Sequence, residues 1–230
     1  MIQPTRYSGI YTSYDSSSSS SSSRASTSGS HRFHSAADAA LTDINSVSSG
    51  RKLLQSIAQK ASGGEKKVTI QSVSGSRSAG TQAVLTRSQL NSYQPSSFRE
   101  NVSIATALSE KSGWSKGKGS SAIIEWNSDR SSIQLNGNGS PMGFVDGGDS
   151  DRVSVLSHEL VHAKHILSGT RKANYEPSRR YDPSSSAGKE EARAVGIGKY
   201  AYSKTGKPSE NSIRQERGLP LRKYYGPPRS

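Results

Sequence analysis

The stretch SHELVHAKHILSGT, residues 157–170, carries three of the five histidines of the chain. Within it His158, Glu159 and His162 spell H-E-x-x-H. Residues four apart lie on one face of a helix with Cβ atoms ~5–6 Å apart, so two imidazoles can reach one Zn²⁺ at about 2.0–2.1 Å. Glu159 follows the first imidazole and can accept a proton from the zinc-bound water. The motif therefore predicts a Lewis acid and a general base on one turn of helix.

The residues around the motif have the pattern of an amphipathic helix that begins near Ser150 or Asp151 and ends at Gly169. Apolar residues recur in steps of three and four and form one stripe: Val153, Leu156, Leu160, Ala163 and Leu167. The two motif histidines lie off this stripe, which favours a metal site over a chance match. We interpret His165 as a solvated surface residue, with a role beside the metal or in a substrate cleft as the alternative.

A catalytic zinc takes three protein ligands and one water, so a third ligand is required. The metzincin spacing needs a glycine and a further histidine, but those positions hold His165 and Ser168. The aspartate-type spacing reaches Ala173 instead of an aspartate, with Asp182 as a distant alternative. Neither of these two classes fits the chain.

A glutamate on a later helix, as in the gluzincins, remains. Residues 189–195 are predicted to be helical before Gly196, and they carry Glu190 and Glu191. Neighbouring helical residues point about 100° apart, so only one of the two can face the metal. A solvated surface carboxylate is the ordinary role of such a pair, and the sequence leaves open which one is the ligand.

The first half of the chain predicts helices and a strand in some segments and gives no assignment in others. Residues 36–64 predict two helices interrupted at Gly50, and residues 68–73 predict a strand. Residues 74–100 are polar and receive no assignment.

The middle of the chain predicts further strands. SAIIEWNSD, residues 121–129, is the best strand signal, and SSIQLNG, residues 131–137, is its expected hairpin partner. The glycine-rich residues 137–151 are expected to form a loop. The strand near Trp126 is a candidate edge for an extended substrate, although a core strand is the simpler interpretation.

Composition separates the N-terminus from the rest. Only 30% of the 230 residues are hydrophobic and 7% aromatic, which is lean for a core spread over the whole chain. The eight consecutive serines at 16–23 cannot bury enough apolar area to offset their ordering entropy. We therefore expect a disordered serine-rich segment over 1–36 and a folded α+β domain with a small sheet over 37–230. The profile of the first fifty residues resembles the amino-terminal signals of bacterial type III secretion substrates.

Charge and cysteine content bound the function. The absence of cysteine excludes disulfides and Cys-based zinc knuckles, and no apolar run approaches the roughly 18 residues of a membrane span. The net charge of +13 favours acidic partners. No aromatic–basic pattern typical of RNA-binding modules is present, so no nucleic acid is expected as a partner. Two alternatives to an enzyme remain: a basic module that binds nucleic acid or an acidic host protein, and an effector whose zinc is structural.

Three segments occur in an order that resembles the NleD-type zinc metallopeptidases, which are type III effectors of bacterial pathogens. They are residues 157–170, EEARAVGIGKY at 190–200 and ENSIRQERGLPLRKYY at 210–225. The resemblance covers about residues 150–225 and implies a zincin-like, gluzincin-type domain. It implies His158 and His162 as zinc ligands and Glu159 as the catalytic base. It also implies a third ligand in EARAVG, for which Glu191 is the first choice and Glu190 the alternative.

The resemblance further implies a virulence protease that is secreted with the type III machinery or a chaperone and translocated into the host-cell cytoplasm. It would bind one Zn²⁺ per chain and hydrolyse peptide bonds of host proteins. Protein kinases are candidate substrates, because the known member of the family cleaves mitogen-activated protein kinases. The implied mechanism uses a zinc-bound water with Glu159 as general base. Candidate oxyanion or substrate contacts are Tyr200, Tyr202, Tyr224, Tyr225 and Arg222.

Overall fold

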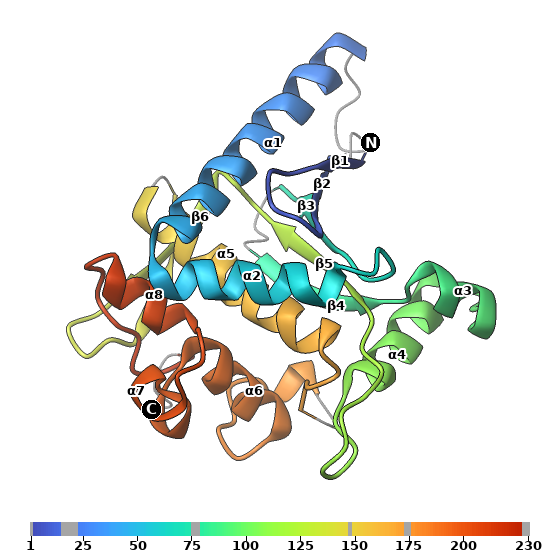
Figure 1. Cartoon of the computed structure of the whole chain (residues 1–230). Helices are drawn as coiled ribbons and strands as arrows, with labels where there is room; N and C mark the ends of the chain where they lie inside the picture. The colour runs from blue at the N-terminus through green and yellow to red at the C-terminus, as the bar shows by residue number, and fades with distance from the viewer. Residues whose placement is uncertain (1, 15–22, 75–78, 147–148, 173–175, 227–230) are drawn as a thin grey trace.

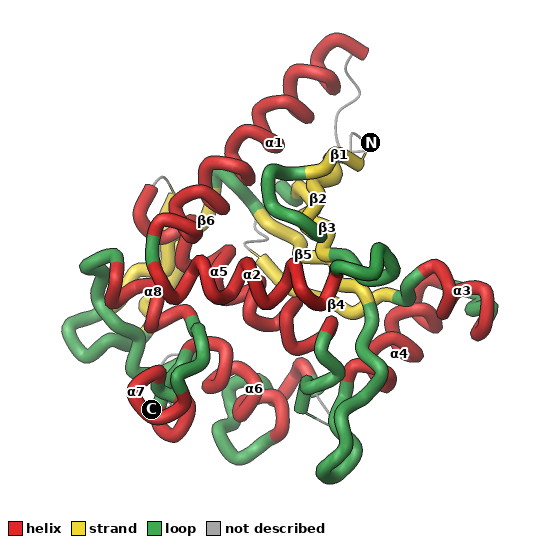
Figure 2. The backbone as a smooth tube through the Cα atoms, in the orientation of Figure 1, coloured by secondary structure: helices red, strands yellow, loops and turns green. Residues whose placement is uncertain are grey.

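The computed structural model describes residues 2–14, 23–74, 79–146, 149–172 and 176–226 (Figure 1). Helices pack against a five-stranded mixed sheet, and a separate two-stranded sheet lies at one side (Figure 2). The predicted α+β class is confirmed by this arrangement.

The main sheet has the strand order β1-β2-β3-β5-β4. Strands β2, β3 and β5 run parallel, whereas β1 is antiparallel to β2 and β4 is antiparallel to β5. The strands are β1 (Ile2–Pro4), β2 (Ile10–Ser13), β3 (Val68–Ser72), β4 (Ala79–Val84) and β5 (Ser121–Trp126). Ile10, Ile70 and Ile124 are fully buried, so the central strands have a face in the core.

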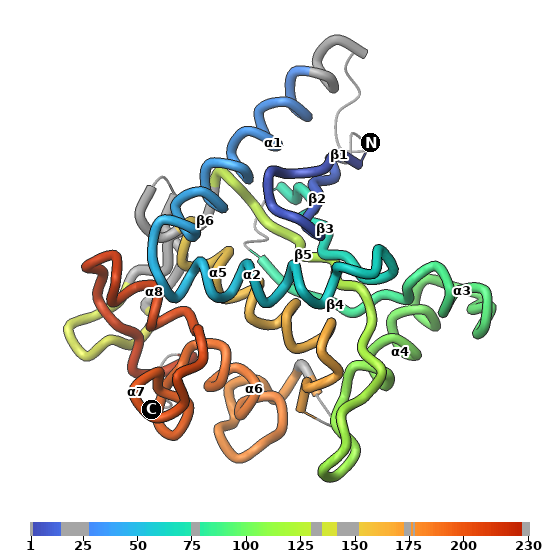
Figure 3. Tube along the Cα trace, in the orientation of Figure 1, coloured from blue at the N-terminus to red at the C-terminus, as the bar shows by residue number. Residues whose placement is uncertain are grey.

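The N-terminal segment differs from the expected disorder over residues 1–36. Strand β2 pairs with β3 in the register Ile10–Val68 to Ser13–Gln71, and the dark blue strands lie beside β3 in Figure 3. Helix α1 (Ser23–Ser46) buries Phe33. The prediction is wrong for these parts because a strand partner that lies more than fifty residues away leaves no trace in local composition. Residues 16–22 of the serine run lie outside the described residues.

Helices α1 and α2 (Ser48–Ala61) confirm the two helices expected in 36–64. The break between them is at Val47, and Gly50 lies inside α2 and does not interrupt it. A Cβ atom on Gly50 would collide with the carbonyl oxygen of Ile44. The glycine therefore allows the start of α2 to pack against the end of α1.

The unassigned region 74–100 contains β4, helix α3 (Arg87–Tyr93) and the start of α4 (Phe98–Ser109). Thr86 and Gln89 form a capping box at the start of α3. The Ser97 hydroxyl accepts from the Glu100 amide at the start of α4. These caps stabilise short helices that have little apolar periodicity of their own.

The predicted hairpin between the strands at 121–129 and 131–137 is wrong. Strand β5 pairs with β3 and β4, while β6 (Arg130–Leu135) pairs with β7 (Pro141–Asp146) in the two-stranded sheet. Strand β7 lies in the segment expected to be a loop, where glycine and proline mask its alternation. The side-chain pattern of β6 predicted a strand correctly but could not identify its partner.

Helix α5 (Asp149–Leu167) confirms the predicted central helix, and Gly169 beyond it has φ +62°. It packs against α1 and α2, against β4 and β5, and against α6 (Ser186–Val195) and α8 (Glu210–Glu216). The expectation of one apolar stripe is wrong, because the helix is buried on nearly every side: Val153, Val155, Leu156, Leu160, Val161, Ala163, Ile166 and Leu167 are all buried. Because other helices and strands pack on opposite sides of α5, the helix has apolar residues on more than one face.

Shorter elements complete the C-terminal part: η1 (Pro177–Arg179), η2 (Gly198–Tyr200) and α7 (Tyr202–Thr205). No helix in the described ranges is long and apolar enough to span a bilayer.

Candidate metal centre

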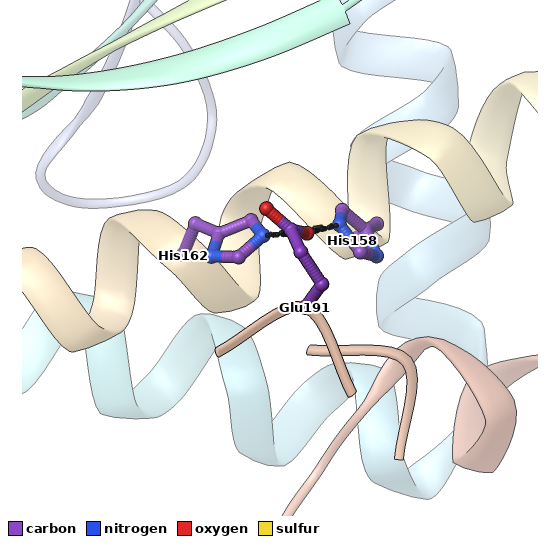
Figure 4. A group of neighbouring side chains, drawn as sticks. All are labelled: His158, His162 and Glu191. Carbon is purple, nitrogen blue, oxygen red and sulfur yellow. Dashed lines mark hydrogen bonds and ion pairs between the residues drawn. The ribbon is translucent and has the colours of Figure 1, made fainter. Parts of the chain in front are cut away.

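Helices α5 and α6 bring three side chains to one point (Figure 4). His158 Nε2 and His162 Nε2 each lie 3.0 Å from Glu191 Oε2, and the two nitrogens lie 3.0 Å from each other. The motif histidines come from consecutive turns of α5, and Glu191 comes from α6. Glu191 is thus the glutamate that the structure places against both motif histidines.

This donor set is compatible with zinc. Two imidazole nitrogens and one carboxylate oxygen are a common protein contribution to a catalytic zinc site. Ligand atoms at about 2.0–2.1 Å from a tetrahedral zinc are about 3.3 Å apart, close to the 3.0 Å triangle of His158, His162 and Glu191. The two imidazole nitrogens and the carboxylate oxygen converge on one point and direct their lone pairs to it. A metal cation can bind all three lone pairs at once, whereas a single proton cannot.

A second glutamate orients His158 from behind. The Nδ1 atom of His158 lies 3.0 Å from Glu210 Oε2 on α8. When Nδ1–H donates to this carboxylate, Nε2 keeps its lone pair for a metal. Arg214 Nε and Arg222 Nη1 donate to Glu210 at 2.9 and 2.8 Å, so the carboxylate is held on both oxygens.

The other glutamate of α6 points to a different histidine. Glu190 Oε1 lies 2.6 Å from His165 Nδ1 and 3.8 Å from His162 Nδ1. The interpretation of His165 as a solvated surface residue is wrong, because its ring is buried and bonded to Glu190. The sequence could not show this, because α6 covers that side of α5 only in the folded chain. Glu190 therefore lies behind His162 as Glu210 lies behind His158.

Burial and charge oppose each other at these groups. Burial lowers the pKa of His162, but the charge of Glu191 and the contacts with Glu190 outweigh it and raise the pKa to about 10. His158 shows the same balance: burial lowers its pKa, and hydrogen bonds with Glu191 and Glu210 raise it above the ordinary value. The buried carboxylates therefore favour a positive charge at both imidazoles. A divalent cation bound there would supply that charge.

The pKa values of the carboxylates are shifted in the opposite direction to those of the two motif histidines. Burial raises the pKa of Glu191, but the charge of His162 and hydrogen bonds from both motif histidines outweigh it and hold the pKa well below its usual range. Burial also raises the pKa of Glu210, and Arg222 and His158 bring it below its usual range. His165 differs, since burial lowers its pKa to about 4 despite Glu190, and its ring is neutral at pH 7.

A pocket of about 470 Å³ lies beside the metal centre and is lined by Glu159, His162 and Glu191 together with residues of β4. The Thr81 hydroxyl on β4 donates to Glu159 Oε2 at 2.6 Å. The side chain of Glu159 is thereby held at the wall of the pocket rather than in the protein interior.

The five candidate oxyanion residues lie in different surroundings, and only some of them are near the pocket. Tyr225 lines the pocket, and its ring stacks on His158 with the ring centroids 5.7 Å apart. Arg222 is buried, bonded to Glu210 and to the Tyr225 carbonyl. Tyr202 accepts from Lys52 at 3.0 Å, Tyr224 is half exposed, and Tyr200 lines a different cavity. Of the five, Tyr225 alone borders the pocket over Glu159.

The remaining alternative for a ligand does not join the cluster. Asp182 pairs with Arg179 at 2.7 Å and accepts from Ser184. Thr81 and Glu210 also contact the site, and the sequence did not predict either of them. Glu210 lies in a segment quoted for the family resemblance, and a carboxylate there, followed by arginines at 214 and 222, was the available signal.

Comparison with known proteins identifies the family of the chain. The family model Peptidase_M91, described as an effector protein, matches residues 21–225 of the chain. The match includes all the helices from α1 to α8, and it includes the three convergent side chains. A search of curated proteins gives no match.

Proposed function

The chain belongs to the Peptidase_M91 family of effector proteins, and we propose that it is a zinc-dependent endopeptidase that cleaves proteins of a host cell. One observation carries the proposal: His158, His162 and Glu191 converge within hydrogen-bonding distance, beside a pocket that Glu159 lines. In the proposal, Glu159 is a general base next to a three-ligand metal site of the gluzincin type.

In this proposal His158 Nε2, His162 Nε2 and Glu191 Oε2 hold one zinc ion. When bound, zinc polarises the scissile carbonyl and lowers the pKa of a water toward about 7. Glu159 accepts the proton of the attacking water and afterwards gives it to the leaving amine. Thr81 holds the Glu159 carboxylate at the pocket wall during both transfers. Tyr225 is the proposed donor to the oxyanion, because it borders the same pocket.

The edge strand that carries the substrate is β4. The candidate suggested by the sequence, near Trp126, belongs to β5, which lies between β3 and β4 and is not an edge. Strand β4 pairs with β5 alone among the described strands, and residues 79–82 of β4 line the pocket. An extended peptide that pairs with this edge would cross the pocket beside Glu159.

Delivery and substrate choice complete the proposal. We propose that the N-terminal segment directs type III secretion and that the enzyme acts in the host-cell cytoplasm on host proteins, with mitogen-activated protein kinases as the first candidates. Because β1 and β2 belong to the main sheet, a signal that includes them must leave the sheet before export and return to it afterwards.

The test is the substitution Glu159→Gln, which keeps the shape of the side chain and removes its ability to accept a proton. New peptide ends in host-cell lysate are counted by mass spectrometry. We expect cleavage to fall by about 10²–10⁴-fold, with bound zinc unchanged at one ion per chain. Glu65→Gln, the same change at an exposed position, is the matched control and should cleave normally. Full activity of Glu159→Gln would show that this carboxylate is not the base.

A further inference from the structure

A second cavity, of about 320 Å³, lies beyond Glu190 and shares no lining residue with the pocket over Glu159. Its lining residues come from the end of α5 and the residues after it, from α6, η2, α7 and the segment that follows α7, and from the loop between α4 and β5. Five cationic residues line it: Lys111, Lys172, Arg193, Lys199 and Lys207. They come from four separate parts of the chain, so only the fold brings their charges together.

The positive charge of this cavity is only partly balanced, since Arg193 alone among its five cations pairs with a described carboxylate. Among the described lining residues there is no aspartate or glutamate. The four lysines form no ion pair with any described residue. Arg193 contacts Glu190 Oε2 at 3.3 Å, and its shorter bond, of 2.6 Å, goes to the Thr170 carbonyl. Like charges gathered in a concave site repel one another and concentrate the positive potential there. A bound anion would relieve that repulsion.

One neutral side chain of the cavity, Tyr200, also favours an anion as the ligand. The Tyr200 hydroxyl is buried and has no hydrogen-bond partner in the described chain. The ammonium groups of Lys172 and Lys199 lie 5.9 and 5.4 Å from the centre of the Tyr200 ring. A buried hydroxyl without a partner is costly unless a ligand accepts its proton. Tyr200 thus carries an unsatisfied donor, and two lysine cations lie near its ring.

We propose that this cavity binds a small polyphosphate, a compact ligand with several phosphate groups. Cavities of about 300–1,000 Å³ are the size that small molecules occupy. Nucleic acid is instead tracked by extended basic grooves, whereas these five cations line one concavity. Phosphate oxygens accept charge-assisted hydrogen bonds from lysine, arginine and a tyrosine hydroxyl.

The cavity is separated from the metal centre by one side chain. His165 and Arg193 line the cavity and both contact Glu190, which in turn lies 3.8 Å from His162 Nδ1. The binding proposal does not depend on peptidase activity, because its readout is binding alone.

The experiment titrates purified full-length chain by calorimetry at ~0.15 M salt, where weak surface attraction is screened. The probes are tripolyphosphate, ATP and inositol hexakisphosphate, with single-stranded RNA as the macromolecular comparison. We expect saturable binding of the small polyphosphates with one site per chain. Tighter binding of ATP would identify a nucleotide as the source of the phosphates, and tighter binding of inositol hexakisphosphate would identify an inositol phosphate.

Two double variants with the same change of charge decide whether the cavity is the site. Lys172→Gln with Lys199→Gln should weaken binding by at least about tenfold. Lys60→Gln with Lys116→Gln, at exposed positions outside the cavity, should change it by less than about twofold. Tyr200→Phe should weaken binding several-fold. Equal losses in the two double variants, no saturable binding, or binding of RNA without the small polyphosphates would overturn the proposal.

Discussion

At the scale of single residues, the candidate metal centre has a supporting carboxylate behind each motif histidine. Glu210 holds the outer nitrogen of His158, and Glu190 lies behind His162. The motif itself was readable because its spacing is local. The segment that holds Glu210 was quoted for the family resemblance, but its contact with His158, 52 residues earlier, could not be predicted, because only the packing of α8 against α5 makes it.

Glu210→Gln tests this support. The amide oxygen can still accept from His158, but the charge that raises ligand basicity is lost. We expect zinc affinity, measured by competition with a chelator, to fall by about 10–100-fold. Glu216→Gln is the control on the same helix, because Glu216 bonds to Ser49 and not to His158. Equal zinc affinity in the two variants would mean that Glu210 does not act on the metal centre.

At the scale of elements, sequence periodicity identified α2, α5, β3 and β5, whose apolar residues face the core. It failed for β4 and β7. Strand β4, with the sequence AGTQAV, is an edge strand that faces a pocket, so most of its side chains need not be apolar. The predicted partner of β6 was wrong because the partner of a strand depends on the whole sheet.

Gly50→Ala tests how α1 and α2 meet. Helix propensity alone would make alanine stabilising by ~1 kcal/mol. The added Cβ, however, meets the Ile44 carbonyl, and we expect a net loss of about 1–3 kcal/mol. Thermal unfolding should then show a lower Tm. Gly63→Ala is the control, since a Cβ there meets nothing within 4 Å. A Tm for Gly50→Ala at or above that of wild type would contradict this packing.

At the scale of the whole molecule, one core cluster extends from Ile10 to Ile213. The lean composition suggested a disordered N-terminus, but the apolar residues are concentrated around α5, and β2 and α1 contribute to the same cluster. The low overall hydrophobicity of the chain therefore did not show which of its residues fold. The same concentration explains how helices from distant parts of the chain meet at one histidine pair.

The most direct test of the metal centre is anomalous diffraction at the zinc edge from crystals grown with zinc. The account predicts one strong peak per chain, about 2.0–2.2 Å from His158 Nε2, His162 Nε2 and a Glu191 oxygen. A peak bound by His165 and Glu190 instead, or no peak between the two motif histidines, would contradict it.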